Sequence, residues 1–136
     1  MGFFAHVMIE NENSNVRARQ CKGRITRWEE RQSSGSFARH SYVAAPIVIK
    51  WANEEFGPID IEPDEARRLD LVHATQSNPN HMALHTTKSG QGVQTLFSPG
   101  VYRAEVRVSG ENAREASAWF EIDFGTWNQI TVTEVS

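Results

Sequence analysis

The amino-acid sequence predicts an all-β protein, an antiparallel β-sandwich of about seven to nine strands. Segments in which apolar and polar residues alternate recur at intervals of roughly 8 to 12 residues, and turn residues separate them. No long stretch shows the period of a helix. The best-defined pair of segments forms a hairpin from Pro99 to Phe124, which is the strongest evidence for this fold class.

The first strand of this hairpin follows the turn Ser98-Pro99-Gly100, in which proline presets φ and glycine accepts a positive φ. Over residues 102–108, apolar side chains alternate with charged ones, so Tyr102 belongs to the face that we expect to be buried. Arg103 and Arg107 belong to the opposite, solvated face.

The second strand of the hairpin follows a polar turn at residues 109–112 and covers residues 117–124. Its apolar positions, Phe120 among them, share one face. Trp119 and Glu121 share the other face with a serine and an aspartate. Two matched amphipathic strands around a polar turn are the pattern of a β-hairpin.

The rest of the chain predicts strands of the same kind. Residues 21–28 alternate from Cys21 through Gly23 and Ile25 to Arg27. Further strands are expected at 44–51, 81–87, 129–135 and 3–10, the last with Phe3, Ala5, Val7 and Ile9 on one side. Polar runs predict loops at 11–15, 32–36 and 76–80.

Residues 59–72 allow two interpretations. Pro63, followed by two acidic residues, could open a short helix. Alternatively, one strand ends at Ile61, Pro63-Asp64 forms a turn, and Leu69 and Leu71 belong to the next strand. The second interpretation is favoured because the neighbouring segments all predict strands.

Composition describes an ordinary globular chain, and we expect residues 1–136 to form a single domain. Hydrophobic residues make up 39% and charged residues 23%, and the net charge is −3. An acidic chain gives no reason to expect a nucleic-acid partner, and the arginines of residues 17–31 predict a solvated face. No segment has the length and apolarity of a membrane span or a signal peptide.

The compartment is not indicated beyond a mild preference. Cys21 is the only cysteine, which excludes an intrachain disulfide and favours a reducing compartment. The chain could also be a domain cut from a longer protein, and a membrane anchor would then lie outside it.

Several motifs together resemble a known group of proteins. They are the stretch Pro99-Gly100-Val101-Tyr102-Arg103, the strands on either side of Ser109-Gly110-Glu111-Asn112-Ala113, and the segments Ala18 to Gly23, Ile49-Lys50-Trp51 and Ile61-Glu62-Pro63. In these features the chain is similar to small, uncharacterised prokaryotic immunoglobulin-like domains. The resemblance implies an immunoglobulin-like β-sandwich, attached to membrane segments in some members, and it carries no catalytic residues.

Three residues are predicted to have structural roles. Tyr102 resembles a tyrosine corner, whose hydroxyl bonds back to nearby backbone. Trp51 ends the apolar segment and resembles the core tryptophan of immunoglobulin folds. Cys21 is expected to be a small buried apolar residue, because no histidine or methionine flanks it as a nucleophile pair or copper site would require.

The sequence predicts no catalytic residue, metal site or cofactor. On a strand, His81 and His85 would lie roughly 13 Å apart at about 3.3 Å per residue, too far to share one metal ion. No nucleophile elbow or dinucleotide-binding loop is present. Nothing fixes the separation of any two carboxylates, so a hydrolase is the least favoured function.

The aromatic residues carry the remaining functional signal. Trp119 is expected on a polar face, where it needs either cover from the same chain or a partner. We therefore expect an interaction module that binds a protein or a second copy of itself, with a surface made of Trp119, Glu121, Arg103 and Arg107. The alternative is a carbohydrate-binding module that uses exposed tryptophans.

Overall fold

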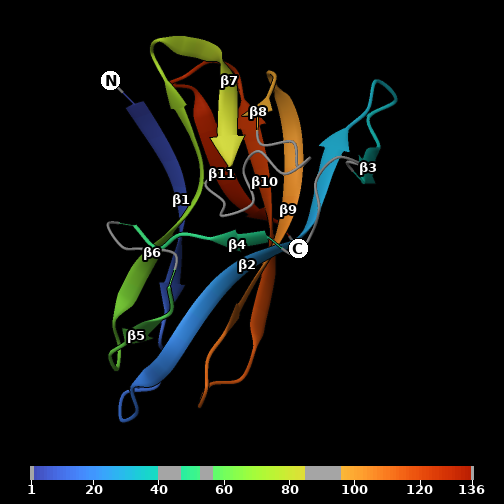
Figure 1. Ribbon diagram of the computed structural model, residues 1–136. Helices are drawn as coiled ribbons and strands as arrows, with labels where there is room; N and C mark the ends of the chain where they lie inside the picture. The colour runs from blue at the N-terminus through green and yellow to red at the C-terminus, as the bar shows by residue number, and fades with distance from the viewer. Residues whose placement is uncertain (1, 40–46, 53–56, 85–95, 136) are drawn as a thin grey trace.

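The computed structural model describes residues 2–39, 47–52, 57–84 and 96–135 (Figure 1). These residues form two antiparallel β-sheets that pack against each other, and they contain no helix. The predicted β-sandwich is therefore confirmed. The described residues form eleven strands, more than the predicted seven to nine, because several strands contain only two or three residues.

The smaller sheet contains four strands in the order β1-β6-β7-β8. They are β1 (Gly2–Glu10), β6 (Ala66–Thr75), β7 (Asn78–Leu84) and β8 (Leu96–Phe97). Strand β1 forms one edge of this sheet. Its side chains alternate between an inner face that packs on the core and an outer face that is exposed.

The larger sheet has seven strands built around β2 (Ala18–Arg31). On one side of β2 lie β9, β10 and β11, with bounds Gly100–Ser109, Ala116–Phe124 and Ile130–Val135. On its other side, three short strands pair with successive parts of β2: β5 (Ile59–Ile61), β4 (Ile47–Ile49) and β3 (Phe37–Arg39).

The predicted hairpin is confirmed as β9 and β10. Residues of the two strands face each other from Gly100 and Phe124 to Val108 and Ala116. Tyr102 and Ile122 are opposite one another on the inner face and are almost fully buried.

Residues 59–72 confirm the strand–turn–strand interpretation. Strand β5 ends at Ile61 and β6 begins at Ala66. Asp64 turns the chain with a φ of 58°, in the left-handed region that aspartate adopts more readily than most residues. No helix forms in this segment.

Two local expectations were wrong. The loop predicted at 76–80 is a turn at residues 76–77, and β7 already begins at Asn78. Arg27 does not share the inner face with Ile25, because a bulge between them shifts the alternation and places Trp28 in the core instead. The predicted strand at 81–87 is described only as far as Leu84, and residues 44–46 also lie outside the described part.

One segment joins the two sheets. In Figure 1, β4 runs across the sandwich from β2 towards β6. Trp51 follows it, pairs with Leu69 of β6 and is 1% exposed. Its indole nitrogen donates a hydrogen bond to the carbonyl of Cys21 on β2, at 3.2 Å. Trp51 therefore contacts both sheets.

Tyr102 has the geometry of a tyrosine corner. Its hydroxyl donates a hydrogen bond of 2.6 Å to the carbonyl of Ser98, four residues earlier in the chain. Its ring packs beside Trp28 and Phe97, with centroid distances of 5.5 Å to each. Burial, and secondarily the negative charge of Glu30, raises the pKa of Tyr102 to about 12.

A Tyr102→Phe substitution should remove both the hydrogen bond and a pH dependence. We expect a loss of about 0.5–1.5 kcal/mol of unfolding free energy at neutral pH. An unfolded tyrosine ionises near pH 10. Between about pH 10 and 12 the folded state therefore keeps a proton that the unfolded state releases, and stability falls as the pH rises. Denaturant unfolding across this range should show a shallower decline for the phenylalanine variant, and equal slopes would contradict the assignment.

Candidate functional site

The residues of the predicted interaction surface do lie together. Trp119 and Glu121 on β10, and Arg103 and Arg107 on β9, share the outer face of the larger sheet, and Glu121 stands opposite Arg103. We call these four residues the Trp119 surface.

The arginines of this face are paired within the chain. Arg103 contacts Glu121 at 3.2 Å, and Arg107 contacts Glu115 at 3.1 Å. Glu115 also forms an ion pair with Arg24 of β2. A partner that covered this face would have to remove water from these ion pairs. The free energy that this desolvation costs would offset much of the free energy gained from burying the face.

Trp119 is also covered in part. It is neither buried nor strongly exposed, and the guanidinium carbon of Arg27 lies 5.9 Å from the centroid of its ring. This is the range of a cation–π contact. An arginine of the same sheet therefore provides part of the cover that Trp119 needs.

A cleft of about 550 Å³ opens at one end of the sandwich. The loop before β2, strand β5 and the β9–β10 connection all lie at this end (Figure 1). Apolar side chains from both sheets line the cleft, among them Ile9, Ile61, Val106 and Phe120. Glu10, Glu12, Glu134 and Arg114 also line it.

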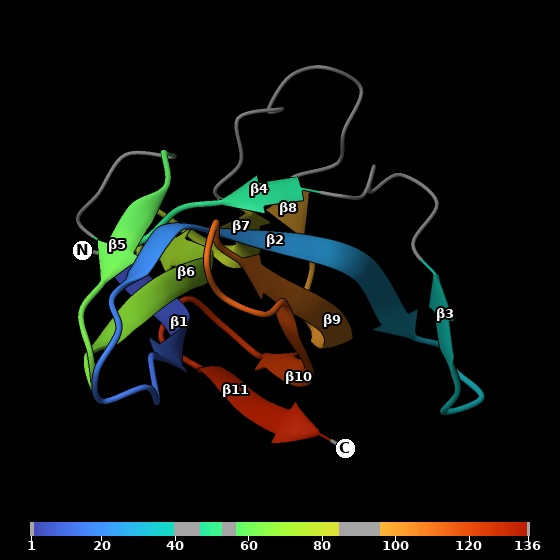
Figure 2. The same ribbon diagram turned by 90° about the horizontal axis from the view of Figure 1, so that it is seen from below.

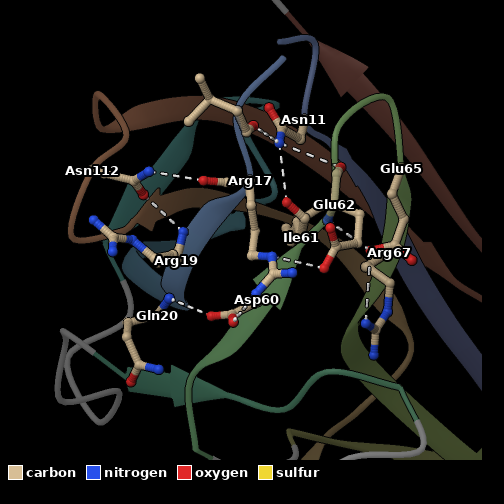
Figure 3. Close-up of polar contacts among 11 residues, drawn as sticks. Asn11, Arg17, Arg19, Gln20, Asp60, Ile61, Glu62, Glu65, Arg67 and Asn112 are labelled. Atoms are coloured by element: carbon tan, nitrogen blue, oxygen red, sulfur yellow. Dashed lines mark hydrogen bonds and ion pairs between the residues drawn. The ribbon is translucent and has the colours of Figure 1, made fainter. Parts of the chain in front are cut away.

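A set of polar contacts holds this end of the sandwich together (Figure 3). Asn112 accepts a hydrogen bond from the Arg19 amide and donates one to the Arg17 carbonyl, both at 2.8 Å. The Arg17 guanidinium pairs with Glu62 at 2.9 Å, and Asn11 donates to the Ile61 carbonyl at 3.0 Å. Side-chain bonds thus join three segments that are far apart in the sequence, and alternation of residues does not predict such bonds.

Cys21 lines the cleft but is a poor nucleophile. Its side chain is 2% exposed, and burial, with a smaller effect of the Asp60 carboxylate, raises the pKa of the thiol. A thiol in such surroundings stays protonated and unreactive. The preceding residue, Gln20, has a φ of 54°. Its backbone amide donates a hydrogen bond of 3.0 Å to the Asp60 carboxylate.

The outer face of the smaller sheet is different in character. Four residues form one row across its strands: Phe4 is opposite His73, His73 is opposite Ala83, and Ala83 is opposite Leu96. We call this the apolar row. Phe4 stacks on His73 with a centroid distance of 5.2 Å.

Large apolar side chains are exposed along this face. Phe4 is 46% exposed and Leu96 is 49% exposed, and Met8, on the same outward side of β1, is 56% exposed. The sequence predicted a buried side of this strand, with Phe3, Ala5, Val7 and Ile9, but no role for its other side. The signal was present, because phenylalanine and methionine alternate with the inward residues.

A shallow hollow of about 280 Å³ lies beside the apolar row. Phe4 and His6 of β1 line it with Lys50, Ala52, Arg68 and Asp70. Asp70 is 6% exposed and its amide donates to the Lys50 carbonyl at 2.9 Å. Charges of both signs meet here, which gives the hollow no clear preference for a charged ligand.

The histidines do not converge in the part of the chain that the structure describes. His81 bonds to Asn78 at 3.0 Å, and His6 and His73 lie on other strands. His40 and His85 lie outside the described residues. Within residues 2–39, 47–52, 57–84 and 96–135, no three of the side chains His, Cys, Asp and Glu are grouped as a metal site.

The described residues also contain no helix of the length and apolarity that a membrane crossing needs. Comparison with known proteins found no matching family model, curated protein or solved structure. The resemblance to prokaryotic immunoglobulin-like domains therefore stays a prediction from the motifs alone.

Proposed function

We propose that this chain is a non-catalytic binding module of immunoglobulin-like type, and that its partner is a protein. The observation that supports the proposal is the unequal character of the two outer faces. Of the large apolar side chains that are strongly exposed among the described residues, Phe4, Met8 and Leu96 belong to the outer face of the smaller sheet. Val16, in the loop before β2, is the other one.

Such side chains favour a protein partner. Aromatic residues and methionine are enriched in protein interfaces, and charged residues are depleted at interface centres. Phe4 and Met8 are residues of these types, and no residue of the apolar row is acidic, lysine or arginine, whereas the Trp119 surface is crossed by ion pairs. We therefore propose the contact on the outer face of the smaller sheet, and not on the Trp119 surface expected from the sequence.

The carbohydrate-binding alternative gains no support from the tryptophans. A sugar platform needs exposed, flat-lying rings. Trp28 and Trp51 are each 1% exposed, Trp127 is partly buried against the core, and Trp119 lies under Arg27. No observation favours this function over a protein contact.

Site-specific photo-cross-linking in the cells that make the protein tests the proposal. A photoreactive phenylalanine analogue at position 4 should give covalent protein adducts, identified by mass spectrometry. The same analogue at position 119 is the matched control and should give few or none. Adding Met8→Lys should abolish the adducts at position 4, because it places a charge on the same outward face of the same strand. Adducts from position 119 alone would contradict the proposed face.

A further inference from the structure

Of the sheet edges among the described residues, the one formed by β1 is the longest. β1 has nine residues, whereas β8 at the other edge of this sheet has two. In the larger sheet, β11 has six residues, and the opposite edge is divided among strands of three residues. An edge strand offers unpaired backbone groups that can bind another strand.

The edge of β1 lacks the features that usually prevent such pairing. Natural edge strands carry lysine, proline or a bulge. From Gly2 to Ile9 the chain contains no proline and no acidic or basic residue apart from His6. The irregularity between β1 and β6 adds its extra residue, Leu71, to β6, so the alternation of β1 is uninterrupted.

In β1, residues at equal distances on either side of the central His6 have similar side chains. Counting outward from His6, the equidistant residues are Ala5 and Val7, then Phe4 and Met8, then Phe3 and Ile9. Each pair joins two apolar residues on the same face of the strand. An antiparallel copy placed over a two-fold axis at His6 would therefore oppose like with like at every apolar position.

We propose that β1 pairs antiparallel with β1 of a second copy of this chain, around a two-fold axis at His6. The two smaller sheets then form one continuous sheet of eight strands. Phe4 of each copy faces Met8 of the other on the outer face. This inference rests on the proposed function and names its partner as a second copy.

The register is set by the side chains. Because opposite residues must lie on the same face, the register can shift only by two residues. One shift places Phe4 against Glu10, and the other places Met8 against Gly2 and leaves Ile9 without a partner. The register centred on His6 pairs all nine residues and avoids both mismatches.

Among the described residues, the neighbours of β1 are β6 and β11. Within the described residues, β6 is the one strand that pairs with β1. Figure 2 shows β1 and β11, the edge strands of the two sheets, along the same flank of the sandwich. A second copy that pairs with β1 therefore also lies near β11. Its Met8 lies next to Phe4, so the apolar row extends onto the outer face of the second copy.

Sedimentation of the purified protein over a range of concentrations tests the dimer and its register. The wild-type chain should show a monomer–dimer equilibrium. Phe4→Lys and Met8→Glu should each weaken the dimer about tenfold or more, because each disrupts both of the symmetry-related Phe4–Met8 pairs. A mixture of the two variants should dimerise better than either alone, since the new lysine faces the new glutamate across the axis.

Disulfide trapping gives a second measurement that does not depend on those variants. Directly opposite residues of antiparallel strands have Cα atoms about 4.5–5.5 Å apart, within disulfide range. His6→Cys should therefore form an intermolecular disulfide under mild oxidation. Met8→Cys is the control and should not, because the two positions would lie roughly 13 Å apart. The native Cys21 is buried and should not take part.

The outcomes separate this inference from the proposed function. A chain that stays monomeric at all concentrations, or a dimer that Phe4→Lys, Met8→Glu and His6→Cys do not affect as described, overturns pairing through β1. Cross-links from position 4 to a different protein would then still support the proposed function. If position 4 gives no adducts of either kind, both proposals fail.

Discussion

Replacing Trp51 with alanine is expected to lower the free energy of unfolding by about 3–5 kcal/mol, the usual loss for a large buried aromatic residue. Trp51 is 1% exposed and lies where the chain crosses between the sheets. Its backbone pairs with Leu69 of the smaller sheet, and its indole bonds to the Cys21 carbonyl of the larger one. The substitution therefore removes contacts that hold the two layers together.

Two control variants separate the contributions to this loss of unfolding free energy. Trp51→Phe keeps most of the apolar area but removes the donor to Cys21, so it should cost about 1–3 kcal/mol, because a buried carbonyl loses its partner. Trp119→Ala removes an indole that is only partly buried and should cost clearly less than Trp51→Ala. Denaturant unfolding followed by circular dichroism measures all three. Equal losses for Trp51→Ala and Trp119→Ala would contradict the role of Trp51.

The strands that could be predicted are those with one solvent-exposed face and one buried face. Burial on one side leaves a period of two in the sequence, and this pattern was clear in the β9–β10 hairpin. The same pattern, with Pro63 as a turn residue, was enough to favour two strands over a helix at residues 59–72. Local physics determines these elements, so local sequence predicts them.

Features that depend on the partner strand were not predictable. The bulge that moves Arg27 to the outer face arises in the pairing with β9, where Thr26 is the extra residue. Pro79 indicated a loop, yet it lies in β7. It is tolerated there because neither β6 nor β8 pairs with it, so its missing amide hydrogen is not needed.

The candidate surface was predictable only in part. Alternation correctly placed Trp119, Glu121, Arg103 and Arg107 on one face. It could not show that Glu115 and Arg27 complete the ion pairs and the cover of that face, because both come from other parts of the chain. Which strand lies at a sheet edge depends on strand order, a long-range property, so alternation alone could not indicate a role for the outward side of β1.

Gly23→Ala is expected to destabilise the protein by about 1–3 kcal/mol through overpacking. Gly23 lies on the inner face of β2, where an ideal Cβ would be 2.5 Å from Cδ2 and 2.7 Å from Cδ1 of Leu69. Leu69 is fully buried on β6, so it cannot move aside without displacing other core residues. Glycine is therefore needed at this position for the close approach of the two sheets.

A double-mutant cycle with Leu69→Ala distinguishes this clash from a general effect of adding a methyl group. Leu69→Ala alone should cost about 2–5 kcal/mol, and the double variant should be more stable than the sum of the two losses predicts, because the smaller side chain leaves room for the new Cβ. Gly100→Ala is the matched control. Its Cβ would meet the Tyr102 ring at 3.6 Å, an ordinary contact, so little change is expected. Additive losses in the cycle, or equal effects at positions 23 and 100, would show that the approach of β2 to β6 does not depend on Gly23.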